Sequence, residues 1–107
     1  LRKETPDYSK MDYVAFKEGH ILFQKGDFLS SKEEFENFML KYPDSEYFLR
    51  AQFWYAQTLE ELKYFTKAFE VYKELRERNF KSDIIDLKIE RLEKLSKEEK
   101  QRNKNQR

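Results

Sequence analysis

The sequence predicts an all-α protein, and three observations support that class. The chain has 107 residues but only two glycines and two prolines, so the turn residues that a sheet needs between its strands are missing. Charged residues make up 40% of the chain, which is typical of helices with solvated faces. The ten phenylalanines and seven tyrosines recur mainly at helical spacing. The length fits one domain of packed helices.

The composition also restricts the classes of function. The 22 basic and 21 acidic residues interleave and give a net charge of +1, which provides no long-range attraction for nucleic acid. Cysteine is absent, so disulfides, thiol nucleophiles and cysteine-ligated metals are excluded. No apolar run reaches the roughly 18 residues of a membrane span. The first residue is Leu1, so we expect a trimmed or mature fragment, which leaves open a signal peptide or a lipidated terminus before this residue.

The first predicted elements are an extended segment and a helix. Residues 1–8 lack periodicity, and Pro6 disfavours helical geometry in the residue before it. Ser9 or Asp12 is the expected cap of a first helix, which Gly26-Asp27 ends. Its apolar stripe consists of Tyr13, Phe16, Gly19, Leu22 and Phe23.

The second and third helices are separated by a proline junction. The second helix is predicted from about Leu29 to Tyr42, with Ser30 or Ser31 as its cap. Pro43-Asp44-Ser45 ends it and caps a third helix from about Glu46 to Leu62. The apolar face of the second helix consists of Phe35, Phe38, Met39 and Tyr42.

Two more helices complete the prediction. The turn before the fourth helix has no glycine or proline and is inferred at Lys63–Thr66, so this helix runs from about Thr66 to Asn79. Lys81-Ser82-Asp83 predicts a linker and cap, and a fifth helix covers residues 83–98. Residues 99–107 contain no apolar side chain, so we expect a disordered, solvated tail.

The sequence repeats itself at an offset of 37 residues, which predicts two copies of one helix-turn-helix unit. Small residues recur where the helices of a pair must approach closely, and aromatic residues recur in the groove between them. The matched positions are Phe16 with Phe53, Gly19 with Ala56, Leu22 with Leu59, Phe28 with Phe65, Ser31 with Ala68, Phe35 with Tyr72, and Phe38 with Leu75.

This order of residues resembles the tetratricopeptide repeat. The matching residues are Gly19, Leu22, Gly26-Asp27-Phe28, Ser31, Phe35 and Pro43 in the first copy, and Ala56, Leu59, Phe65, Ala68 and Tyr72 in the second. The second copy departs from the family at Lys63, where the turn glycine belongs, and at Phe80, where the proline belongs. The offset is also longer than the family's usual period of about 34 residues.

The resemblance implies a short right-handed α-solenoid over residues 9–98. It places one repeat at about 12–45, a second at about 49–82, and a capping helix at 83–98. In such a pair the first helix lines the concave side, where a protein partner binds.

The junction Tyr42–Tyr47 (YPDSEY), with the aromatic cluster that ends at Ala56, is similar to tetratricopeptide proteins of the bacterial envelope. It resembles the BamD-type lipoproteins of the outer-membrane β-barrel assembly machinery, and next the CpoB-type (YbgF) periplasmic proteins, over residues 6–80. The BamD-type proteins are longer than this chain. The resemblance implies a non-enzymatic scaffold at the periplasmic face of the outer membrane, with a β-barrel assembly protein or another envelope component as partner. Contact with the membrane is expected only through an N-terminal lipid anchor upstream of Leu1.

Two other functions remain open from the sequence. One is a CpoB-like periplasmic adaptor in envelope and division coordination, and the other is a cytosolic peptide-binding adaptor. No phosphate loop, nucleophile motif or paired-carboxylate pocket occurs, so we predict no enzyme activity and no cofactor. His20, the only histidine, has Phe16 and Gln24 as its neighbours one turn away, so no metal site is predicted.

The predicted partner-binding residues are the exposed positions on the first helix of each pair. They are Tyr13, Lys17, His20, Gln24, Arg50, Trp54, Gln57 and Glu61. Trp54 is the expected main contact, because its neighbours match core positions and large aromatic anchors dominate interface energies. The alternative is that Trp54 covers the next helix as ordinary packing.

Overall fold

The computed structural model describes residues 8–105, and five helices make up this part of the chain. They are α1 (Tyr8–Gln24), α2 (Phe28–Lys41), α3 (Phe48–Glu61), α4 (Phe65–Glu77) and α5 (Asp83–Asn105). No strand occurs among these residues, so the predicted all-α class is confirmed. None of the five helices is long and apolar enough to cross a membrane.

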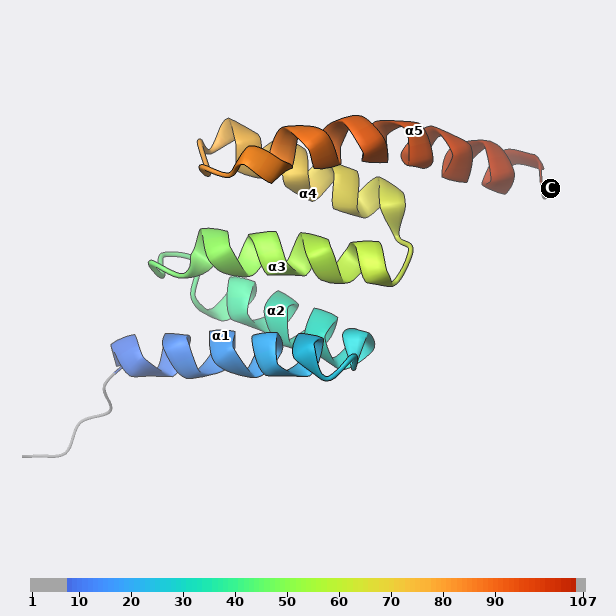
Figure 1. The fold of residues 1–107 in the computed structure, drawn as a ribbon. Coiled ribbons are helices and arrows are strands. Elements are labelled where there is room, and N and C mark those ends of the chain that lie inside the picture. The colour runs from blue at the N-terminus through green and yellow to red at the C-terminus, as the bar shows by residue number, and fades with distance from the viewer. Residues whose placement is uncertain (1–7, 106–107) are drawn as a thin grey trace, which may run out of the picture.

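The helices stack in chain order, from α1 at one end to α5 at the other (Figure 1). Each helix packs chiefly on its neighbours in sequence, and α1 also touches α3. The short connections explain this order, because a helix joined to the next by a few residues must fold back against it. The bounds of α2, α3 and α4 differ from the predicted ones by no more than two residues.

The predicted serine and aspartate caps are wrong for α1 and α2. α1 begins at Tyr8, so Ser9 and Asp12 lie inside the helix, and residues 1–7 of the predicted extended segment fall outside the described residues. Asp12 is buried and accepts a hydrogen bond from Ser45 Oγ in the α2–α3 connection. Ser31 lies inside α2, where its Oγ donates to the carbonyl oxygen of Gly19 over 2.8 Å. Asp12 and Ser31 thus form hydrogen bonds with residues outside their own helices and do not cap those helices.

The predicted end of α5 and the predicted disordered tail are also wrong. The helix continues past residue 98 to Asn105, and only residues 106–107 of the tail lie outside the described part. A contact with the start of α4 stabilises these turns: Glu99 accepts hydrogen bonds from the backbone N–H groups of Phe65 (3.3 Å) and Thr66 (3.1 Å). The carboxylate thus satisfies donors that every helix leaves free at its first turn.

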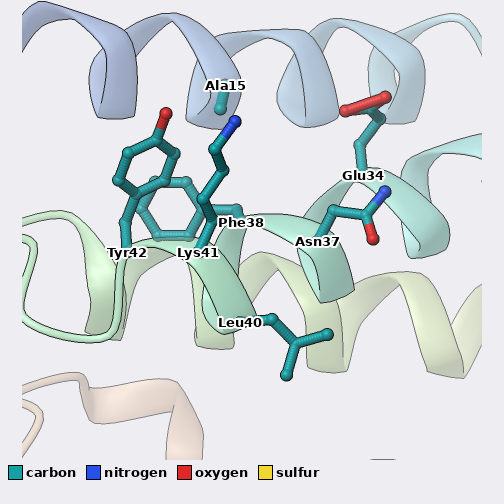
Figure 2. Close-up of a pocket in the computed structure, with 7 residues that line it drawn as sticks. All are labelled: Ala15, Glu34, Asn37, Phe38, Leu40, Lys41 and Tyr42. Atoms are coloured by element: carbon teal, nitrogen blue, oxygen red, sulfur yellow. The ribbon is translucent and has the colours of Figure 1, made fainter. Parts of the chain in front are cut away.

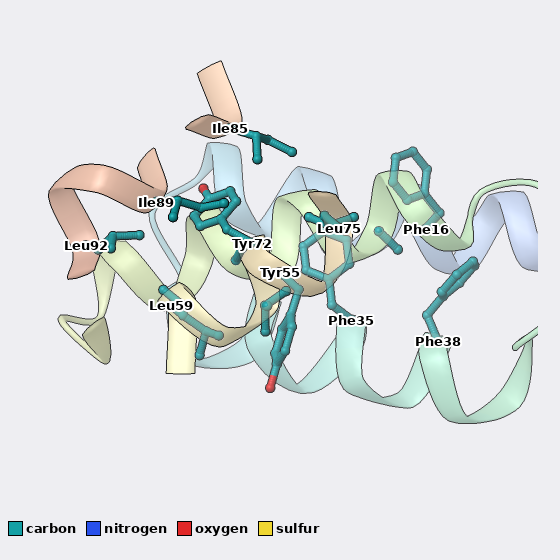
Figure 3. Close-up of a cluster of buried hydrophobic side chains, with 14 residues drawn as sticks. Phe16, Phe35, Phe38, Tyr55, Leu59, Tyr72, Leu75, Ile85, Ile89 and Leu92 are labelled. Carbon is teal, nitrogen blue, oxygen red and sulfur yellow. The ribbon is translucent and has the colours of Figure 1, made fainter. Parts of the chain in front are cut away.

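One cluster of buried apolar side chains runs through the stack (Figure 3). Its larger members are Phe16, Phe35, Phe38, Tyr55, Leu59, Tyr72, Leu75, Ile85, Ile89 and Leu92. The predicted small positions lie where helices approach most closely. A Cβ atom on Gly19 would lie 2.8 Å from Cε1 of Phe35, and Ala56 and Ala68 are fully buried. α1 and α2 can therefore pack at this distance only because residue 19 has no side chain.

The turns inside the two helix pairs have the same backbone geometry although their sequences differ. Gly26 has a φ of 82°, and Lys63, 37 residues later, has a φ of 68°. Asp27 N–H donates to the Leu22 carbonyl over 2.9 Å, and Tyr64 N–H donates to the Leu59 carbonyl over 2.9 Å. The left-handed conformation that glycine adopts freely in the first turn is thus adopted by a lysine in the second.

Candidate functional site: the α1–α3 face

The eight predicted partner-binding residues lie on two helices in contact, α1 and α3. On each helix they are spaced by three or four residues, so each set follows one side of its helix. The rings of His20 and Trp54 lie 4.5 Å apart, which joins the two rows into one surface. We call this surface the α1–α3 face. It consists of Tyr13, Lys17, His20 and Gln24 from α1 and Arg50, Trp54, Gln57 and Glu61 from α3.

Trp54 lies at the centre of the α1–α3 face and is half-buried. Besides His20, its ring contacts Phe23 at 5.2 Å and Phe53 at 5.8 Å, both edge-on. Such tilted pairs are favourable beyond the apolar area that they bury. Trp54 therefore packs on α1 and still keeps part of its surface exposed, while its predicted contact with a partner stays a prediction.

Tyr47 is a member of the face that the sequence did not single out. Its ring lies 5.4 Å from that of Tyr13 and 5.7 Å from that of Phe16. The guanidinium carbon of Arg50 lies 5.8 Å from the centre of the same ring. Tyr47 thus links Tyr13 to Arg50 across the two helices. The available signal was an aromatic residue in the first turn of the predicted third helix, at the end of the YPDSEY junction.

The remaining residues of the face differ in hydrogen bonding and in exposure to solvent. The side-chain oxygen of Gln57 accepts a hydrogen bond from the Tyr72 hydroxyl over 3.1 Å, so this amide is partly engaged with α4. Gln24 and Glu61 are exposed, and Lys17 is half-exposed. Polar side chains therefore surround the aromatic centre, which is the usual arrangement at the rim of a protein–protein contact.

His20 stacks on Phe16, with ring centres 6.3 Å apart and planes within 7°. Partial burial, followed by the positive charge of Lys17, lowers the pKa of His20 below its ordinary value of 6.5. The imidazole is therefore neutral at pH 7. Among the side chains that the structure describes, no three His, Cys, Asp or Glu residues are placed to hold a metal ion.

An ionic cluster joins α3 to α4 and α5 beside the face. Glu60 accepts a hydrogen bond of 2.6 Å from the Tyr72 hydroxyl and forms ion pairs with Lys88, at 3.0 Å, and with Arg91. The side chain of Glu60 is only 10% exposed. Burial and the Glu60 carboxylate raise the pKa of Tyr72, so its hydroxyl stays protonated and donates. The cluster fixes α5 against α3 by charge.

Comparison with known protein families, with curated proteins and with solved structures finds no match to this chain.

Proposed function

We propose that this chain is a non-enzymatic protein–protein interaction scaffold whose partner binds on the α1–α3 face. The observation that carries the proposal is Trp54, a half-buried aromatic ring at the centre of two adjacent rows of polar side chains. Aromatic anchors in partly desolvated sites supply much of the binding energy at interfaces. Lys17 and Arg50 add positive charge at the rim, where it favours association rate and specificity.

The proposal includes a tetratricopeptide architecture of two repeats and a capping helix, forming a short right-handed α-solenoid. Recurrent contacts support it, because each has a counterpart 37 residues later. The rings of Phe16 and Phe35 lie 6.3 Å apart, and those of Phe53 and Tyr72 lie 6.1 Å apart. Ser45 Oγ accepts the Tyr47 N–H over 3.0 Å, as Ser82 Oγ accepts the Ile84 N–H over 3.4 Å.

The bacterial envelope is the proposed location, and the chain would join a β-barrel assembly protein or another envelope component there. Support for this part is the resemblance of the Tyr42–Tyr47 junction to BamD-type lipoproteins. The junction also has a structural role in this chain. Ser45 connects Asp12 of α1 to the start of α3 through its hydrogen bonds, which fixes how the second helix pair leaves the first.

Binding of the purified chain to a purified outer-membrane β-barrel assembly protein tests the proposal. We expect the double variant Lys17→Glu/Arg50→Glu to weaken binding at least about tenfold, because it reverses two rim charges beside Trp54. The matched control is Lys67→Glu/Lys81→Glu, which makes the same change of net charge at two exposed positions away from the face. Circular dichroism should show both variants folded.

Two results would count against the proposal. Equal weakening by both double variants would mean that net charge decides the binding and not the α1–α3 face. Recovery of the chain solely with cytosolic proteins after cell fractionation would remove the envelope location and leave a cytosolic adaptor.

A further inference from the structure

α1 has a second exposed surface, distinct from the α1–α3 face. Met11, Val14 and Ile21 lie along one side of the helix with Glu18 between them, and the three apolar side chains are 43–54% exposed. Residues spaced in this way form one stripe on a helix. We call this stripe the outer face of α1. Exposed apolar side chains that gather in one stripe are typical of a contact surface.

The matching side of α3 is covered. The positions 37 residues after the outer face are Phe48, Ala51, Tyr55 and Thr58. Ala51, Tyr55 and Thr58 are at most 5% exposed. The covering element is α2, which packs on α3 and receives a hydrogen bond of 2.7 Å from the Tyr55 hydroxyl to Glu36. α3 thus has a helical cover on this side, whereas α1 has none among the residues that the structure describes.

The hollows on the two helix pairs also differ in whether a covering helix contributes to their lining. A hollow on the second pair is lined by Gln52, Tyr55, Val71 and Glu74, by Lys67, and by three residues of the covering helix, Glu36, Met39 and Leu40. Subtracting 37 from the first four gives Ala15, Glu18, Glu34 and Asn37. These residues line hollows of about 500, 360 and 340 Å³ along α1 and α2, where the lining comes from the first pair alone. Figure 2 shows Lys41, Tyr42 and Glu34 of this region reaching toward α1.

The charge of the hollows indicates what would fit them. Glu18 and Glu34 line one hollow together, beside Ile21 and Leu22, whereas Lys41 lines the other two. In the α2–α3 contact the carboxylate comes from the covering helix, as Glu36, and the covered helix offers the phenol of Tyr55. On α1 the carboxylate, Glu18, is on the covered helix. A cover for α1 must therefore offer a hydrogen-bond donor at that point, and a cation is the best match for the two carboxylates of this hollow.

A second copy of the chain does not meet this requirement. The far end of the stack exposes Leu87 and Lys94 on α5 but also three acidic residues, Asp86, Glu90 and Glu93, so head-to-tail stacking would place several carboxylates near Glu18 and Glu34. A two-fold contact through α1 would bring Glu18 close to its own copy. Both arrangements juxtapose like charges, which is unfavourable at an interface.

We propose that the outer face of α1 binds an amphipathic helix of a partner protein. This helix presents large apolar side chains to Met11, Val14 and Ile21, and a lysine or arginine to Glu18 and Glu34. The proposal goes beyond the scaffold function of the α1–α3 face, because it concerns a different side of α1 and another binding mode.

A helix-stabilised peptide with the sequence of α2 is the appropriate probe, because α2 covers the matching side of α3. Two versions are needed, one with Glu36 unchanged and one with Glu36→Lys. Titrated into the isotope-labelled full chain, the lysine peptide should shift the amide signals of the outer face and bind about fivefold more tightly than the glutamate peptide. Glu18→Lys in the protein should reverse that preference.

Two further variants locate the binding. Val14→Asp should abolish binding of the lysine peptide, whereas Leu87→Asp, at an exposed leucine of α5, should leave it unchanged. Three results would overturn the proposal: amide shifts confined to the α1–α3 face, no preference between the peptides, or no binding of either peptide at millimolar concentration. Self-association of the chain that Val14→Asp removes would show instead that a second copy covers the face. Failure of any of these leaves the α1–α3 binding test unaffected.

Discussion

The two ends of the helix stack differ in how their apolar and charged side chains are arranged. At the first end α1 presents a stripe of Met11, Val14 and Ile21 to solvent. At the other end α5 exposes Asp86, Glu90 and Glu93 along one side, with Leu87 exposed beside them. A stack of helices ends without a loss of solubility when its last helix is polar on the outside. α5 therefore closes the core, whereas α1 leaves an apolar surface open.

The register of the chain explains how α5 closes the stack. Asp86, Glu90 and Glu93 lie 37 residues after Leu49, Phe53 and Ala56, which face the neighbouring helix α4 or the core. Among residues 8–105, only α4 packs on α5, and it does so on another side, so these charged positions are exposed to solvent. Positions related by the 37-residue offset thus carry packing residues on α3 and solvated residues on α5. A substitution at such a position should therefore have different effects on the two helices.

The largest expected effect is at one such position, residue 19. Gly19→Leu should destabilise the protein by about 3 kcal/mol, because its side chain must enter the space that the Phe35 ring fills. The equivalent change on α5, Glu93→Leu, should alter the free energy of unfolding by no more than about 0.5 kcal/mol, because Glu93 is exposed. Urea denaturation followed by circular dichroism measures both. Equal effects would mean that α5 does not end the stack.

The next effect concerns how α5 is attached. The ring of Trp54 on α3 contacts that of Phe23 on α1. The residues 37 positions after Trp54 and Phe23 are Arg91 and Glu60, and these two form an ion pair. We expect Glu60→Ala to cost about 2 kcal/mol, since it leaves Lys88 without its acceptor and removes the nearer of the two acceptors of the Tyr72 hydroxyl.

The effect of salt distinguishes the ion pairs of Glu60 from the aromatic contact between Trp54 and Phe23. Chemical denaturation with urea at low and high ionic strength should show a smaller cost of Glu60→Ala in high salt, because Arg91 is largely exposed and screened. A cost that does not change with salt would argue that Glu60 acts through packing and not through charge.

The last turns of α5 give a smaller, pH-dependent effect. Partial burial by itself raises the pKa of Glu99, but the hydrogen bonds from Thr66 and Phe65 outweigh it and lower the pKa below the ordinary 4.5. The stabilisation is therefore fully present above about pH 4.5 and is lost as the pH falls through the lower folded value.

The variant Glu99→Gln isolates the charge. It should cost about 1 kcal/mol at pH 7, as for the loss of a charged helix cap, and much less at pH 3. Unfolding of both proteins at the two pH values measures the difference. If the cost is the same at pH 3 and pH 7, the Glu99 carboxylate does not cap α4.

Periodicity alone was enough to predict the five helices and most of the core. Phe35, Tyr72 and their small partners Gly19 and Ala56 repeat at one offset, and local spacing fixes the side of a helix on which each lies. The turn at Lys63 was harder, because a lysine with positive φ has no signal in its own residue type. It was identified through the first turn, which has a glycine at the matching position.

The parts that the sequence did not predict depend on contacts between distant residues. Glu99 lies in a segment whose composition is typical of a disordered tail. The helix there is stabilised by the hydrogen bonds that Glu99 accepts from Phe65 and Thr66. Tyr47 follows the same logic at the α1–α3 face, since its role depends on Tyr13, 34 residues earlier, lying beside it. Neither position has a local pattern that distinguishes it from an ordinary surface residue.

The central claim is that partners meet this chain at its first end and on the α1–α3 face, while α5 closes the other end. Site-specific photo-crosslinking in intact cells tests it most directly, with the crosslinking residue placed at Val14, Lys17 or Glu90, which lie on the outer face, the α1–α3 face and the closed end. We predict crosslinks to other proteins from Val14 and Lys17 and essentially none from Glu90. Crosslinks from Glu90 that equal or exceed those from Val14 and Lys17 would contradict the account.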